Sequence, residues 1–385
     1  MFDMVESALR CLFGLFSESP QGIDQIENNI KIGYGVNWFL TRKCNLRCSY
    51  CAVVNSQSFK EAYGHIDPFR KDIDIEEAKE FIRRLKKHNP EAFHMFLGGE
   101  PTVYKHLPEL VDFCNKEGVL YTVITNMTDY SYNKIREIID NVGFLNGLSF
   151  TVDPVLWDDN YPKDDDRYKK SKEAYEKFIT FRDDPRIREF VGIVGVDSQN
   201  IKYLHRMCRE LTDAGVWIDL ILMETKLNKY YDFPSPLDYD WLVWDTEENR
   251  RILMEVYEKA EKGEYTVLFH PVIKHKMVPN LPQKYICTID KRMDTMTIDA
   301  DGKLRLCLRI RGVNTQLFHM LDVLDEDGNL TETFKDILHA MQLDKKNLCY
   351  GCQWTCPMAG ELIADGIMSP ELMNHRVTTL KPRNK

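Results

Sequence analysis

Three cysteines near the start of the chain have the types and spacing best suited to chemistry. Cys44, Cys48 and Cys51 are separated by three and then by two residues, and Tyr50 stands just before the last of them. Three thiolates at this spacing can bind three irons of a cubane iron–sulfur cluster and leave the fourth iron without a protein ligand. A structural zinc site, which normally has four ligands, or three unrelated thiols is the alternative interpretation. The spacing favours a cluster with one iron open to chemistry.

The segment from Thr41 to Cys51 resembles the signature of the radical S-adenosylmethionine (radical SAM) enzymes. In that family the open iron chelates the amino and carboxylate groups of SAM, and an electron from the cluster cleaves the sulfonium to give a 5′-deoxyadenosyl radical. The resemblance implies a SAM-binding 4Fe–4S cluster on Cys44, Cys48 and Cys51. It also places Tyr50 near the adenine.

A second motif, Gly98-Gly99-Glu100, follows an apolar run at residues 92–97. Two glycines at a strand end let the backbone approach a ligand closely, and their carbonyl groups and Glu100 can accept hydrogen bonds from an ammonium group. A tight strand-to-helix turn is the alternative. In the radical SAM family a Gly-Gly-Glu motif at the end of the second strand binds the SAM amino group, so the resemblance assigns these three residues to SAM.

The same resemblance implies further SAM contacts at or near the ends of later strands. Asn126 and Ser149 stand where the family has polar contacts to the methionine portion or the ribose, and Arg167 resembles an arginine that pairs with the SAM carboxylate. Each of these residues could equally be a capping or solvated residue. Gly192 and Gly195 could let adenine lie against the backbone, although their spacing differs from the usual glycine motif of the family.

A second group of cysteines lies in the C-terminal region. Cys287 precedes and Cys307 follows residues 299–302, whose sequence Asp-Ala-Asp-Gly predicts a hairpin turn. About forty residues later comes Cys349-Tyr350-Gly351-Cys352, which we interpret as a turn, and Cys356 follows it. A hairpin with one pair of thiolates and a turn with another can close a four-cysteine site around zinc or an iron–sulfur cluster.

This layout resembles the C-terminal auxiliary-cluster domain of many radical SAM enzymes, called SPASM or, in its shortened form, twitch. No cysteine follows Cys356, so the shortened form with one auxiliary 4Fe–4S cluster is the better match. The resemblance implies four ligands for that cluster: Cys287, Cys307, Cys349 and Cys352. Cys356 is then a spare thiol or a substitute for one of the four.

Composition excludes some classes of protein. The net charge of −9 argues against a broad nucleic-acid surface, which needs clustered Lys and Arg. No run of about 18 apolar residues predicts a membrane span, and the first residues do not resemble a secretory signal. Eleven cysteines without such a signal indicate metal binding in a reducing, cytoplasmic compartment. Cys114 and Cys208 fall on apolar helical stripes, which predicts buried thiols.

Short apolar runs alternate with amphipathic segments along the first two thirds of the chain. The expected strands are residues 34–40, 92–97, 120–126, 146–152, 189–196 and 216–223. The expected helices are residues 75–88, 107–117, 131–141, 168–183, 198–214 and 246–262. Such alternation predicts an α/β fold with a parallel sheet and right-handed crossovers. Because the candidate polar groups follow the strands' carboxyl ends, a partial (β/α)6 barrel is favoured over an open doubly wound sheet.

The expected organisation has five parts. They are an N-terminal helical segment (1–33), the barrel (34–225), a loop and helix (226–264), a twitch domain with a β-hairpin and a helix (265–365) and a tail (366–385). The loop is rich in aromatic and acidic residues, and we interpret it either as a substrate lid or as a packing strap.

The resemblance implies a radical SAM oxidoreductase or maturase. An auxiliary cluster with four thiolate ligands would take an electron from the substrate radical, so we expect net oxidation of a small polyol-like or aminocyclitol-like substrate. A ribosomal peptide or protein substrate is the alternative, and an iron–sulfur electron carrier or a zinc-binding protein is the non-enzymatic one. An external one-electron donor such as flavodoxin or ferredoxin is implied. Asp153 and Glu224 are candidate bases, chosen only by their position near strand ends.

Overall fold

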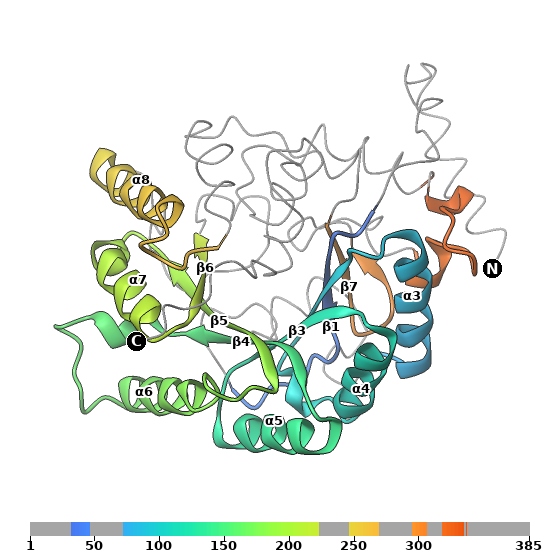
Figure 1. Ribbon diagram of the computed structural model, residues 1–385, viewed down its shortest axis with the longest axis horizontal. Coiled ribbons are helices and arrows are strands. Elements are labelled where there is room, and N and C mark those ends of the chain that lie inside the picture. The colour runs from blue at the N-terminus through green and yellow to red at the C-terminus, as the bar shows by residue number, and fades with distance from the viewer. Residues whose placement is uncertain are drawn as a thin grey trace, which may run out of the picture. The chain divides into compact units, whose positions relative to one another are not determined.

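The computed structural model describes residues 32–46, 72–222, 246–268, 295–305, 318–334 and 336. Eight strands of this part form one sheet in the order β6-β5-β4-β3-β2-β1-β7-β8 (Figure 1). The strands are β1 (Gly35–Phe39), β2 (Phe93–Leu97), β3 (Leu120–Thr125), β4 (Leu145–Val152), β5 (Ile187–Val196), β6 (Trp217–Leu222), β7 (Thr295–Ile298) and β8 (Leu304–Arg305). Neighbours from β6 to β7 are parallel, and only β8 is antiparallel. The predicted α/β partial barrel is confirmed.

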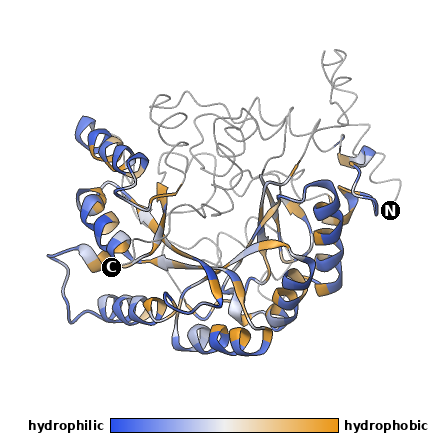
Figure 2. Ribbon diagram, viewed as in Figure 1, coloured by the Kyte–Doolittle hydropathy of each residue, from blue (hydrophilic) through white to orange (hydrophobic). Residues whose placement is uncertain are grey.

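Helices connect the parallel strands and cover one face of the sheet (Figure 1). They are α3 (Ile75–His88), α4 (Leu107–Glu117), α5 (Asp129–Val142), α6 (Asp166–Ile179), α7 (Leu204–Asp213) and α8 (Glu247–Glu261). Their N-terminal caps are local: the Asp74 carboxylate accepts hydrogen bonds from the backbone of Glu76 and Glu77 at 2.9 and 3.1 Å. Figure 2 shows the hydrophobic sides of the helices toward the strands and their hydrophilic sides outward.

Aromatic side chains fill the layer between the helices and the sheet. Phe178 of α6 lies against Phe150 of β4 and Phe190 of β5, with ring centroids 5.0 and 3.8 Å away. Trp38 of β1 packs edge-on against Phe81 of α3 at 5.9 Å. Because side chains alternate along a strand, the neighbours of these residues point to the opposite, helix-free face. That face is the interior of the partial barrel.

Two cysteines outside the expected metal sites also belong to the helix layer. Cys114 of α4 and Cys208 of α7 are fully buried, as the apolar stripes predict. Burial raises the pKa of both thiols well above its ordinary value, so neither is a reactive thiolate. Among the described residues, no helix is long and apolar enough to cross a bilayer.

A seventh parallel strand is the main departure from the sequence-based expectation. The predicted hairpin turn is present: the amide of Gly302, whose φ is +76°, donates to the carbonyl of Asp299 at 2.8 Å. The strand before this turn, β7, pairs in parallel with β1, with Trp38 opposite Ile298. The sequence patterns predict six strands in the barrel and place the hairpin outside it, so this part of the prediction is wrong. The pairing gives β1 a second neighbour, because an uncovered β1 would expose a row of unpaired backbone groups.

Candidate functional site

The cysteine loop directly follows β1, at the carboxyl edge of the sheet. Cys44 is half-buried, and the backbone amide of Leu46 donates to its Sγ at 3.4 Å. An amide directed at a sulfur stabilises a thiolate, the form that binds iron. The donor chemistry at Cys44 therefore fits an iron ligand.

The glycine pair of the second motif holds this loop. The amide of Gly99 donates to the carbonyl of Thr41, and the amide of Glu100 donates to the carbonyl of Lys43, both at 2.8 Å. A Cβ atom on Gly98 would lie 2.3 Å from the Thr41 oxygen, and one on Gly99 would lie 2.0 Å from the Lys43 oxygen. Gly98 also has a φ of +142°, which other residues rarely adopt. We predicted that these glycines let the backbone approach a ligand, and in the structure they let it approach the cysteine loop itself.

Glu100 joins the ends of β2 and β3. Its buried carboxylate accepts bonds from the amide and hydroxyl of Thr102 at 3.2 and 2.7 Å, from the Thr125 hydroxyl at 2.8 Å and from the Asn126 amide at 2.9 Å. Burial raises the pKa of Glu100 and these bonds oppose the rise. Both carboxylate oxygens therefore have partners within the protein.

Asn126, a predicted SAM contact, binds the cysteine loop through Asn45. The Asn126 side-chain amide donates to Asn45 Oδ1, and the Asn45 amide donates to the hydroxyl of Thr128, both at 2.7 Å. Ser131 on α5 donates to Asn126 Oδ1 at 3.0 Å. Asn45 is not among the predicted site residues, because the motif predicts a role for its thiols only. Its place beside Cys44 was the available signal.

The other side of the loop is held by two aspartates. Asp72 accepts from the Thr41 hydroxyl at 2.6 Å and from Lys43 Nζ at 2.8 Å. Asp299, in the β7–β8 turn, accepts two bonds from the Arg42 guanidinium, and the bond from Nε is 2.8 Å long. The sequence patterns contain no signal for the second contact, since the two residues are 257 positions apart.

Three other predicted site residues have partners elsewhere. Arg167 forms two bonds with the Asp153 carboxylate, at 2.7 and 2.9 Å. The arginine predicted for the SAM carboxylate and one predicted base thus bind each other. The Ser149 hydroxyl is buried on the helix-free face and shares a hydrogen bond of 2.9 Å with Thr122 of the neighbouring strand. Its partner is therefore a residue of the sheet itself.

The two glycines suggested for adenine lie on opposite faces of β5. A Cβ atom on Gly192 would lie 3.1 Å from a methyl group of Val216 and 3.2 Å from one of Val152. Gly192 therefore serves the apolar packing toward the helices. Gly195 is half-buried, and the alternation of residues along β5 places it on the helix-free face.

One further carboxylate lies on the helix-free face, and the sequence analysis did not select it. Asp219 of β6 is in register with Ile193 of β5. Burial raises the pKa of Asp219 to about 7. A single acidic residue between apolar neighbours in a predicted strand was the available signal.

The remaining predicted site residues lie outside the described part of the chain. They are Cys48, Tyr50, Cys51, Glu224, Cys287, Cys307, Cys349, Cys352 and Cys356. The N-terminal helical segment up to residue 31 and the aromatic loop at 226–245 also lie outside it.

Comparison with known proteins adds independent findings. Residues 38–211 match the sequence model of the Radical SAM superfamily. The Fe-coproporphyrin III synthase of Methanosarcina barkeri (strain Fusaro / DSM 804) is 33% identical over 93 residues, which are 24% of this chain and 21% of that protein. The tungsten-containing aldehyde ferredoxin oxidoreductase cofactor-modifying protein of Pyrococcus furiosus is 25% identical over 258 residues, or 65% of this chain and 66% of that protein. Each match covers less than two thirds of the relative.

A solved structure shows the same fold. Native anSMEcpe with bound AdoMet and Cp18Cys peptide superposes with a TM-score of 0.52 at 15% sequence identity. The superposition covers 84% of this chain and 88% of that chain.

Proposed function

Residues 38–211 match the sequence model of the Radical SAM superfamily, and from this match we propose that the chain belongs to that superfamily, cleaves SAM reductively and uses the 5′-deoxyadenosyl radical to abstract a hydrogen atom from its substrate. The observation that carries the proposal is the position of the cysteine loop. Two backbone hydrogen bonds of 2.8 Å, from the amides of Gly99 and Glu100, fix the loop on the Gly-Gly-Glu motif at the end of β2. This brings the two motifs of the family into one site, at the edge of the sheet where barrels carry their chemistry.

Each residue of the site has a distinct task. Cys44, together with Cys48 and Cys51, would hold the cluster. A 4Fe–4S cluster with SAM, when bound there, supplies one-electron cleavage of the sulfonium. Gly98 and Gly99 keep the loop in register with β2, since any larger side chain would displace it.

We place the SAM molecule against the part of the site that contacts the loop. Gly98 and Gly99 lie beside the cysteine loop, so we keep their carbonyl groups as SAM contacts, with Tyr50 for the adenine. Asn126 orients the loop instead, because its side chain already binds Asn45 and Ser131. Glu100 acts through the geometry of the two strand ends, because its oxygens already have partners. Arg167 is outside this set, because Asp153 binds its guanidinium.

For the overall reaction we propose oxidation of a small polar molecule of the polyol or aminocyclitol kind. Its radical would lose one proton to a base and one electron to an auxiliary cluster on Cys287, Cys307, Cys349 and Cys352. Asp219 is our candidate base, because a carboxyl group with a pKa of about 7 can both accept and release a proton near neutral pH. In Asp219→Asn we expect turnover of a substrate to fall about 100-fold while SAM cleavage without substrate is unchanged. Equal losses of both activities would exclude this role.

Peptide modification is a second candidate, favoured by one observation. The structural neighbour anSMEcpe was solved with a bound peptide, and its fold covers most of this chain. We would separate the two candidates by mass spectrometry of a polyol panel and a peptide library after anaerobic incubation with SAM. Loss of two hydrogen atoms from a polyol supports the first candidate, and the same loss from a peptide supports the second.

Anaerobic reconstitution tests the central proposal. We expect about four irons per chain from the SAM-binding cluster, about eight if the auxiliary cluster also forms, and 5′-deoxyadenosine after addition of SAM and dithionite. Cys44→Ala should abolish 5′-deoxyadenosine formation, whereas Cys208→Ala, at a buried thiol of α7, should retain it. Zinc as the sole metal, or full activity in Cys44→Ala, would overturn the proposal.

A further inference from the structure

The contact between Arg42 and Asp299 joins two distant parts of the chain at the cluster loop. Arg42 Nε donates to Asp299 Oδ1 at 2.8 Å, and Nη2 donates to the second carboxylate oxygen. The two residues are 257 positions apart, and only 9% of Arg42 and 3% of Asp299 is exposed. A planar guanidinium that makes two parallel bonds to a carboxylate fixes orientation as well as distance.

The aspartate belongs to a rigid turn. The amide of Asp299 donates to the carbonyl of Lys303 at 2.9 Å, and its carbonyl accepts from Gly302 at 2.8 Å. Its own carboxylate also accepts from the amide of Ala300 at 2.7 Å. The carboxylate is therefore held by the hairpin before it meets the arginine.

The hairpin is in turn held by the strand that leads into the cluster loop. Trp38 and Ile298 are the last paired residues of β1 and β7. Arg42 and Asp299 lie beyond these strand ends, so their contact continues the β1–β7 pairing into the loop. Arg42 stands two residues before Cys44. A displacement of the β7–β8 turn would therefore move Cys44 through only two residues of backbone.

We propose that Asp299 is a positioning residue for the SAM-binding cluster, acting through Arg42 on the loop that carries Cys44. This inference rests on the proposed function, and it makes the β7–β8 hairpin a part of the radical-generating site. Asp299 has two effects: it orients the loop, and it neutralises the positive charge that Arg42 brings close to the cluster.

The charge effect predicts a direction. Reduction adds a negative charge to an iron–sulfur cluster, and surrounding charges and hydrogen bonds set its potential. If the carboxylate is replaced by a neutral amide, the buried guanidinium keeps its charge and the negative charge of Asp299 is lost from the site. The reduced cluster is then favoured, and its midpoint potential rises.

The test compares Asp299→Asn with Asp301→Asn in the full-length reconstituted protein. Asp301 is in the same turn and accepts a bond from the amide of Lys303 at 3.2 Å, but it is more exposed than Asp299, so its charge is screened by solvent. We would measure the midpoint potential by redox titration, the EPR spectrum of the dithionite-reduced cluster with and without SAM, and SAM cleavage, with iron content as the check that each variant holds the cluster. We expect Asp299→Asn to raise the potential, alter the SAM-bound spectrum and lower SAM cleavage at least fivefold. Asp301→Asn should match the wild type in all three readouts.

A double variant covers the case in which Asp299→Asn does not fold. Arg42→Gln with Asp299→Asn removes both charges and keeps side chains that can hydrogen-bond each other, so we expect a potential close to that of the wild type. A wild-type potential and spectrum in a folded Asp299→Asn, or a strongly raised potential in the double variant, would overturn the inference. Failure of the proposed function is distinguishable, because the wild type would then bind no cluster that responds to SAM.

Discussion

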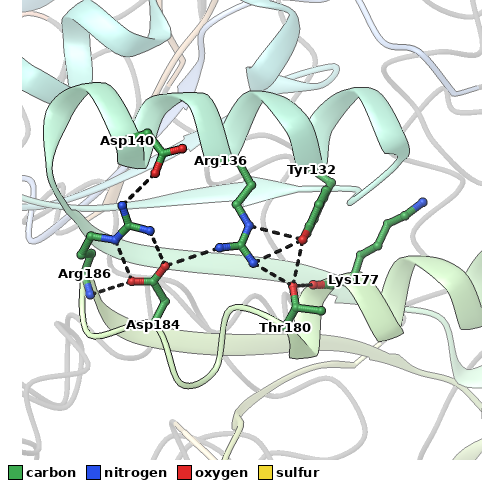
Figure 3. Close-up of polar contacts among 7 residues, drawn as sticks. All are labelled: Tyr132, Arg136, Asp140, Lys177, Thr180, Asp184 and Arg186. Carbon is green, nitrogen blue, oxygen red and sulfur yellow. Dashed lines mark hydrogen bonds and ion pairs between the residues drawn. The ribbon is translucent and has the colours of Figure 1, made fainter.

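Two ion-pair regions of this protein use the same side chains in different environments. One is the buried Arg42–Asp299 contact, whose side chains are 10% and 4% exposed. The other is a surface cluster around α5 and the loop that precedes β5, shown in Figure 3. There Arg186 binds Asp184 at 2.9 and 2.8 Å and Asp140 at 2.8 Å, with 38% of Arg186 and 64% of Asp140 exposed.

The surface cluster is a local structure with several members that support one another. Arg136 binds the hydroxyl of Tyr132 at 3.3 and 3.2 Å, and its guanidinium also lies 3.6 Å from Asp184 (Figure 3). The hydrogen bonds from Arg186 lower the pKa of Asp184, which keeps that carboxylate charged. The Asp184 side chain is only 8% exposed, but its partners Arg136 and Arg186 are 33% and 38% exposed. Because water and salt screen the charges of these arginines, each pair adds only about 0–1 kcal/mol.

The buried pair differs because neither partner can turn to water. Removal of one partner leaves a charge in a poorly solvated site, which costs about 3–5 kcal/mol. The number of ion pairs in a region therefore does not indicate how much they contribute to its stability. The pair that matters to the proposed site is the one with the least exposure and the longest separation in sequence.

The largest effect should come from a change at Gly99, where the backbone of the cysteine loop packs on the end of β2. In Gly99→Ala the new Cβ would meet the Lys43 carbonyl at 2.0 Å, so the cysteine loop must move. We expect iron content to fall and SAM cleavage to drop at least 100-fold, about 3 kcal/mol in transition-state terms. Gly118→Ala is the control: Gly118 has a φ of +64° but no atom within 4 Å of the added methyl group. The Gly118→Ala variant should lose about 1 kcal/mol of stability and keep its activity. A Gly99→Ala variant with full iron content and full activity would refute the proposed packing of the cysteine loop on Gly99.

Removal of the buried cation comes next. Arg42→Met leaves the Asp299 carboxylate buried without its guanidinium, and we expect the free energy of unfolding to fall by about 3–5 kcal/mol. Urea titration of the apoprotein measures this change without the cluster. A loss below about 1 kcal/mol would place this pair in the same class as the surface cluster.

As the pH falls, the contribution of the strands that carry the site to stability should be lost before that of the surface cluster. His94 of β2 accepts a bond from the Trp38 indole at 2.9 Å, and burial lowers the pKa of His94 to about 3. The unfolded chain binds this proton below about pH 6.5, so stability falls by about 2 kcal/mol from this residue as the pH drops from 7 to 5. The pKa of Asp184 is lowered, so its contribution is lost only at pH values below its ordinary 3.8. Asp219 contributes with the opposite sign in the same range, because its pKa of about 7 means that the folded chain takes up a proton that the unfolded chain does not. The His94 step is therefore measured as the difference in thermal unfolding between the wild type and His94→Gln from pH 7 to 5, and the Asp184 step follows at lower pH.

The smallest effect should come from the surface cluster. Arg186→Met should cost at most about 1 kcal/mol, and less in 1 M NaCl, because salt screens exposed charges. SAM cleavage should be unchanged. If Arg186→Met lowered the free energy of unfolding as much as Arg42→Met, burial would not determine how much these ion pairs contribute to stability.

Much of the fold follows from local patterns. The six expected strands and six expected helices all appear, with ends shifted by a few residues, and Asp74 caps α3 as its sequence context indicates. The buried thiols of Cys114 and Cys208 follow from helical periodicity in the same way. These features depend on interactions within a few residues, which a sequence pattern contains.

Part of the candidate site is also readable from short motifs. The cysteine spacing and the Gly-Gly-Glu motif pointed to one end of the sheet, and Asn126 indeed lies beside the cysteine loop. The same reasoning could not show that Asp153 and Arg167 bind each other. Which polar groups pair depends on distances between strand ends and helix starts, which composition and spacing leave open.

The alternation of strands and helices and the residue types at the cluster loop follow from the amino-acid sequence alone. The tertiary fold is needed to place β7 beside β1, the cysteine loop on Gly98 and Gly99, and Asp299 against Arg42. Local periodicity selects each element separately, because its energy comes from near neighbours in the chain. The placement of residue 299 against residue 42 comes from the pairing of two strands far apart in sequence, and this pairing exists only once the sheet has formed.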